Sequence, residues 1–347
     1  MRRLRGWSAG VVVTTMIAAG CVPGPGSPSL STPFDTTKLT VPAVVVYQRI
    51  THTFGLNGQY TSYVARTGVG TSVATAAERG QAQGFDSSLG YRVVDNLTAN
   101  TISTTTAGGT VLGTLVDPMF PIPSSTPTGY WIYGLRWSPD GAKLAITRLF
   151  EILAGGFAAN TTVYDALTGA RLGSTFAGRD FTWKYDSAAV ALPSGADVRT
   201  MVLTAGAAAV TVSTVAPGEC ASPMDWSVGE RLVFLCPAGP DSPVRTLTTM
   251  PATGGPRRLL ESGTTGSTSG WLIDAPTTAR FVPGSNQIIF NRPSSVDSTI
   301  SLQPVTGRAL YVVDDVPGAS PTPVTVVSPT LDQGQGFTTE DLVLGFL

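Results

Sequence analysis

Hydrophobic residues in this chain occur mainly in short runs separated by turn-forming residues. Such runs include residues 44–47 (VVVY), 144–146 (LAI), 288–290 (IIF) and 342–344 (LVL). Each run has the length of a β-strand rather than that of a helix. The chain also contains 39 Gly, 26 Pro and much Thr and Val, but few Lys, which argues against helical bundles and coiled coils. The pattern predicts an all-β protein of many short strands joined by tight turns.

One strand–turn–strand pattern recurs along the chain. Residues 137–146 (WSPDGAKLAI) are matched by residues 183–192 (WKYDSAAVAL), 226–234 (WSVGERLVF) and 281–290 (FVPGSNQIIF), and more weakly by residues 54–63 (FGLNGQYTSY). An aromatic residue closes the first strand of each copy, a turn such as Asp140-Gly141 follows, and apolar residues open the next strand. These aromatic residues are Phe54, Trp137, Trp183, Trp226 and Phe281. We expect them to pack between neighbouring units rather than to bind a ligand.

A second signature follows the first and completes a repeat. Residues 163–172 (VYDALTGARL) match residues 93–102 (VVDNLTANTI), with looser versions at residues 250–259 and 312–318. These segments are typical of a third strand, a turn and a fourth strand. Four strands in about 45 residues are the pattern of a β-propeller blade. We favour six blades, with five or seven as alternatives, and the apolar runs near the two termini are suited to completing one blade together.

The two signatures together resemble a known repeat. W-S-P-D-G-x-x-L-A-I followed by V-x-D-x-x-T-G is similar to the WD-like repeats of TolB-type β-propellers, and the resemblance covers about residues 53 to 328. It implies a propeller fold and an association with proteins of the cell envelope. Because propellers include both binding modules and enzymes, the resemblance defines the fold more closely than the function.

The N-terminus has the pattern of an export signal. Arg2, Arg3 and Arg5 precede an uncharged run over residues 6–20, which is too short to span a bilayer. The small residues directly before Cys21 resemble the lipobox of bacterial lipoproteins, which implies a lipid anchor on Cys21, with plain secretion as the alternative. We therefore divide the chain into a signal peptide (1–20), a Pro/Gly/Ser-rich spacer (21–41) and a propeller domain (42–347).

Charge excludes several kinds of partner. Lys and Arg number 22 and Asp and Glu 23, so the formal charge is −1, and removing residues 1–20 takes away three Arg and leaves −4. This balance lacks the basic field that nucleic acid requires, and no phosphate-binding loop is present. We expect no nucleic acid, no nucleotide and no cofactor, and contact with a membrane only through the lipid on Cys21.

The two remaining cysteines predict a disulfide. With Cys21 set aside, Cys220 and Cys236 form an even pair in an exported chain. If the turn is centred on Val228, Trp226 faces Glu230 and Cys220 faces Cys236, within the reach of a disulfide. The bond would enclose 15 residues and contribute about 3 kcal/mol to stability in the chain-entropy model.

Familiar catalytic machinery is largely missing from the sequence. His52 is the single histidine, so a zinc site of His and Cys is excluded, and no G-x-S-x-G segment is present. We assign no catalytic, cofactor-binding or metal-ligating residue. Carboxylates near the aromatic positions are the remaining candidates for chemistry. They are Asp180, Asp225 and Asp274, whereas Asp140, Asp165 and Asp186 occupy turns, and Asp314-Asp315 does not resemble a calcium loop.

These observations together predict a location and a role. We expect an exported, lipid-anchored propeller of the cell envelope that acts as a non-enzymatic protein-binding module, with an envelope protein as its partner. The alternative is an extracytoplasmic propeller that binds or cleaves glycans through acidic residues on one ring face.

Overall fold

The computed structural model describes residues 34–54, 60–67, 73–76, 91–96, 101–106, 111–116, 130–152, 156–216, 219–237, 244–264, 278–296, 305–325, 331–332 and 335–346. Nearly all of these residues form antiparallel strands or the turns between them, and the helical element among them is a short 3-10 turn, η1 (Thr36–Lys38). The all-β prediction is confirmed.

Three sheets of the described part contain four strands each, in chain order. The first comprises β7 (Tyr130–Trp137), β8 (Lys143–Ile152), β9 (Gly156–Asp165) and β10 (Arg171–Ala177). The second comprises β11 (Thr182–Trp183), β12 (Ala189–Ser194), β13 (Asp197–Val202) and β14 (Val210–Thr214). The third comprises β15 (Asp225–Trp226), β16 (Arg231–Pro237), β17 (Val244–Pro251) and β18 (Arg258–Thr264).

A three-stranded sheet and a nine-stranded sheet account for the other strands. The three-stranded sheet comprises β4 (Tyr91–Asn96), β5 (Thr101–Thr106) and β6 (Val111–Val116). The larger sheet runs through β19 (Ala279–Phe281), β20 (Gln287–Val296), β21 (Val305–Asp314), β24 (Gln335–Phe346), β1 (Val45–Phe54), β2 (Tyr60–Arg66) and β3 (Val73–Ala76). Two short strands extend it: β22 (Thr322–Pro323) pairs with β21, and β23 (Leu331–Asp332) pairs with β24.

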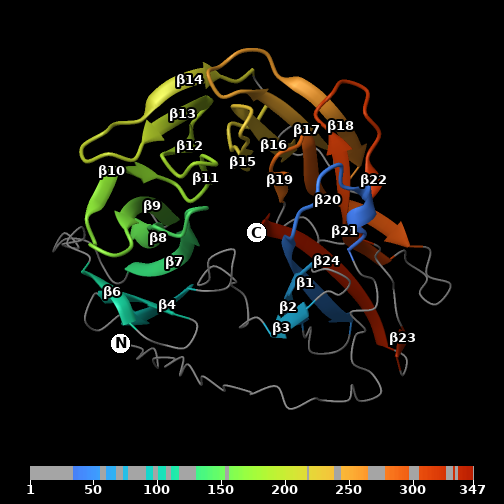
Figure 1. Cartoon of the computed structure of the whole chain (residues 1–347), viewed down its shortest axis with the longest axis horizontal. Coiled ribbons are helices and arrows are strands. Elements are labelled where there is room, and N and C mark those ends of the chain that lie inside the picture. Colours follow the sequence, from blue (N-terminus) through green and yellow to red (C-terminus); the bar gives the residue numbers. More distant parts are fainter. Residues whose placement is uncertain are drawn as a thin grey trace.

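The sheets follow one another around a common centre, as expected for a propeller-like fold (Figure 1). Strands β7, β11, β15 and β19 lie nearest that centre, and β10, β14 and β18 lie farther out. The strands from the two ends of the chain pair with each other: β1 and β24 are antiparallel, with Tyr47 opposite Val343. The terminal apolar runs therefore share one sheet, as their sequences predict.

The repeated strand–turn–strand pattern corresponds to the two innermost strands of each unit. Each leading aromatic lies opposite an aliphatic residue of the next strand, in the pairs Trp137–Leu144, Trp183–Val190, Trp226–Leu232 and Phe281–Ile288. The weak copy differs, because Phe54 ends β1, which is paired on one side with β2 and on the other with β24.

The repeated aromatics help to hold neighbouring sheets together. Trp183 packs with Ala145 and Val163 of the preceding sheet, and Trp226 packs with Ala189 and Ala191 of the sheet before it. Phe281 likewise shares a buried cluster with Val233, Leu235 and Leu247. Burying a large aromatic side chain of this kind contributes about 2 kcal/mol, so the repeat places much of the core at the junctions between sheets.

Residues 34–41, which the sequence assigns to the spacer, pack against the strands. Phe34 is buried, and its ring centroid lies 5.9 Å from that of Tyr47. The backbone N–H of Asp35 donates to the carbonyl of Val324, and Thr40 donates to the side-chain oxygen of Gln287. The ordered part of the fold therefore includes these residues.

Candidate functional site

One position of the repeat carries different chemistry in each sheet. The residue directly before the leading aromatic is Arg136 on β7, Thr182 on β11, Asp225 on β15 and Arg280 on β19. These are the strands nearest the centre in Figure 1. We call Arg136, Asp225 and Arg280 the axial cluster. All three side chains are partly exposed, whereas Thr182 is buried.

Arg136 is a cation in a desolvated position. Its Nη1 donates to the carbonyl of Phe181 at 2.7 Å, and its guanidinium carbon lies 4.4 Å from the centroid of the Phe181 ring. Burial and the positive charge of Arg280 lower the pKa of Arg136 to about 9, against the weaker opposing influence of Asp180 and Asp225. Within the described part of the chain, no carboxylate lies within ion-pair distance of this guanidinium.

Asp225 and Arg280 form a polar link between two neighbouring sheets. The Asp225 carboxylate accepts the backbone N–H of Phe281 at 2.7 Å and lies 3.7 Å from Nη1 of Arg280. Arg280 also donates from Nη1 to the carbonyl of Met224. Burial raises the pKa of Asp225, although Arg280 and the hydrogen bond from Phe281 oppose that shift. The carboxylate therefore already interacts with two groups on β19, the Phe281 N–H and the Arg280 guanidinium.

The other predicted carboxylates do not join this cluster. Asp180 is mostly exposed and lies 3.9 Å from Nε of its neighbour Arg179. Asp140, Asp165 and Asp186 accept backbone N–H groups within their own turns, as Asp side chains commonly do. Asp274 and Cys21 lie outside the described residues, and so does the side chain of His52, whose backbone pairs with Tyr60 and Thr338.

The turns after the aromatics contain two residues in an uncommon conformation. Ser187 and Glu230 have positive φ angles of 58° and 54°, at the position where the first copy has Gly141. Each contacts the turn of the preceding sheet. The Ser187 hydroxyl accepts the backbone N–H of Asp140 at 3.1 Å, and the Glu230 carboxylate lies 3.0 Å from Nζ of Lys184. These contacts offset the strain of a left-handed residue that is not glycine.

Lys184 joins two turns at the end of the inner strands. Its ammonium contacts Asp186 at 3.2 Å and Glu230 at 3.0 Å, and Glu230 in turn accepts Nε1–H of Trp226 at 2.9 Å. The hydrogen bond to Glu230 is the main reason that the pKa of Lys184 is raised. The amine is therefore held in its charged form, which suits a structural link and not a nucleophile.

Asp315 is a polar residue at a repeat position that is apolar in other copies, and it links the nine-stranded sheet to the third four-stranded sheet. Asp315 is buried at the position that Ala166, Leu203 and Ala252 occupy in other copies. Its carboxylate contacts Nε of Arg231 and Nη1 of Arg258, and it accepts the Thr249 hydroxyl at 2.7 Å. Its oxygens are satisfied by these neighbours, so the group links sheets and offers no ligand a free charge.

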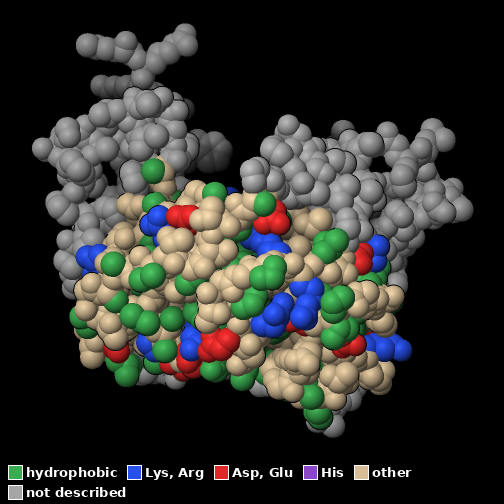
Figure 2. Space-filling view, turned by 90° about the horizontal axis from the view of Figure 1, so that it is seen from above, with side chains coloured by type: hydrophobic (Ala, Val, Ile, Leu, Met, Phe, Trp, Pro, Cys, Tyr) green, Lys and Arg blue, Asp and Glu red, His purple; other side chains and the backbone are tan. Residues whose placement is uncertain are grey.

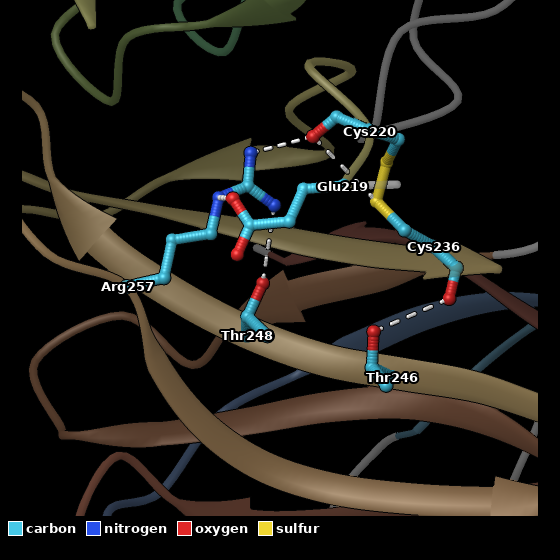
Figure 3. Close-up of a disulfide and its surroundings, with 6 residues drawn as sticks. All are labelled: Glu219, Cys220, Cys236, Thr246, Thr248 and Arg257. Carbon is cyan, nitrogen blue, oxygen red and sulfur yellow. Dashed lines mark hydrogen bonds and ion pairs between the residues drawn. A yellow bond between two sulfur atoms is a disulfide. The ribbon is translucent and has the colours of Figure 1, made fainter. Parts of the chain in front are cut away.

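The predicted disulfide is present, with a different register. Cys220 and Cys236 are bonded, and their Cα atoms are 5.8 Å apart (Figure 3). The prediction that Trp226 faces Glu230 is wrong, because Trp226 pairs with Leu232 and the turn takes two more residues. Cys220 therefore lies before β15 rather than on it, and the bond joins a connecting segment to β16.

Sequence reasoning identified Asp225 but missed Arg280 beside it and Arg136 on β7. The signal was available, since Arg136, Asp225 and Arg280 precede Trp137, Trp226 and Phe281 at one position of the repeat. What that signal lacked was the neighbour of each side chain, because the inner strands of different sheets come near a common centre only in the folded structure. Among the described residues no three His, Cys, Asp or Glu converge as metal ligands. The described part also lacks a helix of the length and hydrophobicity needed to cross a bilayer.

Comparisons with known proteins give similarity in fold at very low sequence identity. No family model matches the chain, and no curated protein matches it. Hydrazine synthase from Kuenenia stuttgartiensis is similar with a TM-score of 0.42 and 11% identity, over 72% of this chain and 70% of that chain. The β-propeller domain of the Trilobed protease from Pyrococcus furiosus has a TM-score of 0.34 and 9% identity, over 84% of this chain and 90% of the domain.

Peptidases are prominent among the similar structures. The acylaminoacyl peptidase of Pyrococcus horikoshii has a TM-score of 0.40 and 10% identity, over 73% of this chain and 40% of the peptidase. This chain therefore spans about two fifths of that enzyme. The predicted function, a non-enzymatic protein-binding module, is contradicted, because the similar structures include several peptidases. At this identity they show the fold alone.

The described surface carries mixed charges and scattered hydrophobic residues. On the side that Figure 2 shows, Lys and Arg side chains are interspersed with Asp and Glu, and hydrophobic side chains are scattered. The large exposed hydrophobic residues of the described part lie on several separate elements, including Leu167, Val202, Val210 and Leu259. Singly exposed residues of this kind are normal on a protein surface and do not define a docking site.

Proposed function

We propose that this chain is a ligand-binding propeller of a peptidase-like protein, and that Arg136 of the axial cluster recognises a carboxylate group of a peptide ligand. The proposal replaces the non-enzymatic binding module with a role in handling a small charged substrate. It assigns recognition, and not bond cleavage, to the described residues.

The observation that carries this proposal is the unbalanced charge of the axial cluster. Two guanidiniums accompany one carboxylate, and Asp225 already contacts Arg280 and the backbone of Phe281. Arg136 is left with an aromatic ring and a carbonyl as its contacts. A desolvated guanidinium gains most from a bound anion, and a carboxylate matches its planar donors. The lowered pKa of Arg136 has the same physical cause, namely a desolvated positive charge under the influence of a second one on Arg280.

Binding of matched peptides tests the proposal. We would titrate acetyl-Gly-Gly-Phe with a free carboxylate, and the same peptide as its amide, into the full chain by calorimetry. The acid should bind at least about tenfold more tightly than the amide, since a charge-assisted hydrogen bond contributes roughly 1.5–3 kcal/mol. Equal binding of the two peptides, or no binding of the acid, would contradict a carboxylate site.

Substitution of Arg136 identifies the residue responsible. Arg136→Gln removes the charge but keeps a hydrogen-bond donor, and it should abolish the preference for the acid peptide. Lys143→Gln is the matched control, because Lys143 is a cation of a blade turn that pairs with Asp140 at 3.2 Å. A preference that survives Arg136→Gln, or that Lys143→Gln removes equally, would assign the effect to general surface charge.

The pH dependence of binding gives a further check. Since the pKa of Arg136 is lowered to about 9, the free protein loses this charge as the pH rises through about 9. Affinity for the acid peptide should be level from pH 6 to 8 and fall above pH 9. Binding of the amide should not follow this profile. A level affinity up to pH 11 would mean that the guanidinium keeps its charge, and the Arg136→Gln variant then decides whether Arg136 binds the acid peptide.

We also propose, from the sequence, that the chain is exported and held at the cell membrane by a lipid on Cys21, close to an envelope partner. The charged N-terminus and the small residues before Cys21 support this location. Cys21→Ser should move the protein from the membrane fraction to the soluble fraction, and retention in the membrane would overturn the anchor. The repeat further supports six blades in a closed ring, which an experimental structure would test.

A further inference from the structure

The segment before β15 is tied to β16 and to the residue that directly precedes β18 in its own sheet. Cys220 is bonded to Cys236 on β16, and its carbonyl accepts Nη2–H of Arg257 (Figure 3). The Arg257 guanidinium lies 4.0 Å from the centroid of the buried Phe234 ring and 3.5 Å from the carboxylate of Glu219. A covalent bond and a hydrogen bond therefore hold Cys220, and the arginine that donates the hydrogen bond also lies over the Phe234 ring.

The same segment leads directly into the axial cluster. Four residues separate Cys220 from Asp225, and two of them, Ala221 and Pro223, are buried. Met224 donates its N–H to Val233 at 2.8 Å, and its carbonyl accepts from Arg280. Asp225 then accepts the N–H of Phe281. The polar contacts of Met224 and Asp225 with β19 thus lie within five residues of the disulfide.

Strand pairing alone constrains the backbone of this segment only weakly. Strand β15 has two residues, which pair with Val233 and Leu232. A two-residue pairing orders few backbone groups against the conformational entropy of the segment, about 1–2 kcal/mol for each residue. The disulfide and Arg257 supply the constraint that the short strand lacks.

We infer that the Cys220–Cys236 disulfide and Arg257 are positioning groups for Asp225 and Arg280, so that the axial cluster responds to reduction of the disulfide. The inference rests on the proposed function as far as ligand affinity is concerned, and on the contacts alone as far as the geometry of the cluster is concerned. A dithiol reductant such as dithiothreitol breaks the S–S bond by supplying two electrons and two protons. Two cysteine thiols form, and the reductant closes to its cyclic disulfide.

Hydrogen exchange of the Phe281 amide measures the positioning without any ligand. In the oxidised full chain this N–H is held by Asp225, and after reduction under native conditions it should exchange at least about tenfold faster. The Leu203 amide, which donates to Ala188 in the neighbouring sheet, is the internal control and should not change. If reduction lowers the melting temperature but leaves hydrogen exchange of the Phe281 amide unchanged, the disulfide stabilises the whole fold without positioning Asp225, and the inference is wrong.

Ligand affinity tests the consequence for the site. The reduced chain and the Cys220→Ser/Cys236→Ser variant should each bind acetyl-Gly-Gly-Phe at least about threefold more weakly than the oxidised chain. Thr246→Val is the matched control, because Thr246 donates to the carbonyl of Cys236 at 3.4 Å without contacting the segment before β15. Unchanged affinity after reduction, with normal binding before it, would overturn the link to the site.

Two further outcomes keep this inference distinct from the proposed function. If the oxidised chain does not bind the peptide but Phe281 exchange still rises on reduction, the proposed function fails and the positioning role stands. If the double serine variant does not fold, Arg257→Gln with the disulfide intact replaces it. That variant removes the hydrogen bond to Cys220 and should raise Phe281 exchange about threefold, whereas no change would contradict the role of Arg257.

Discussion

Asp165, in a turn of the first four-stranded sheet, and Asp225, in the axial cluster, place the same side chain in opposite surroundings. Asp165 accepts the N–H groups of Leu167 and Thr168 within its own turn. Asp225 reaches a different sheet, where it meets Phe281 and Arg280. The first contact is local and belongs to a repeated signature. The second depends on two strands that are 56 residues apart in the chain.

The pKa values of these two aspartates move in opposite directions. Hydrogen bonds from Thr168 lower the pKa of Asp165, because they favour its ionised form. Burial raises the pKa of Asp225, because it disfavours that form. The comparison indicates that the turn aspartates maintain the fold, whereas the inner strands hold charge at an energetic cost, as is common at functional sites.

The largest expected effect is the loss of the Asp225 side chain. Asp225→Ala leaves Arg280 without its carboxylate and the Phe281 N–H without its acceptor, and it should cost about 2–3 kcal/mol of the free energy of unfolding. Asp165→Ala, in an exposed turn, should cost about 1 kcal/mol. Urea unfolding of both variants measures the difference. Equal losses in the free energy of unfolding would mean that the turn aspartate and the axial-cluster aspartate do not differ in importance.

Substitutions of turn residues that have a left-handed backbone conformation should have intermediate effects on stability. Gly284 has a φ of 73° and open space around its α-carbon, so Gly284→Ala should cost about 1–2 kcal/mol from backbone conformation alone. Ser187→Gly relieves similar strain but removes the bond to Asp140, so it should lie within about 0.5 kcal/mol of the wild type. Thermal unfolding tests both. A large loss for Ser187→Gly would mean that the contact between sheets outweighs the strain.

A smaller effect is expected in the pH dependence of stability. The lowered pKa of Asp165 gives a stabilising contribution that is present above its ordinary value of 3.8 and is lost as the pH falls below that value. The raised pKa of Asp225 has the opposite sign: its contribution is largest below 3.8 and is lost as the pH rises through the folded-state pKa. Asp165→Asn should therefore flatten acid unfolding, and Asp225→Asn should steepen it. Denaturant titrations from pH 3 to 7 decide the sign for each variant.

The smallest effect is expected at the surface. Arg179 and Asp180 lie 3.9 Å apart with more than half of each side chain exposed, so Arg179→Ala should change stability by less than about 0.5 kcal/mol. Asp180 influences the pKa of Arg136. A loss above about 1 kcal/mol in urea unfolding would therefore mean that Asp180 interacts electrostatically with the axial cluster.

Local features of the fold were predictable from the residues. The aromatic, turn and aliphatic positions of the repeat predict the strand–turn–strand units at Trp137, Trp183 and Phe281, because strand pairing across a short turn depends on neighbouring residues. The disulfide was predictable from the count of cysteines, but its register was not. The turn after Trp226 contains Glu230 in a left-handed conformation, which its residue type does not signal.

The sequence by itself determined the all-β class, the repeat with its turn aspartates and the Cys220–Cys236 bond, since each follows from residues close in the chain or from simple counting. Only the tertiary structure decided that Arg136, Asp225 and Arg280 lie on the strands nearest the common centre and that the disulfide segment leads to one of these strands. The physical reason is the distance along the chain between the residues that interact. Pairing and turn conformation depend on contacts a few residues apart, whereas desolvation and charge at the centre depend on strands from separate sheets.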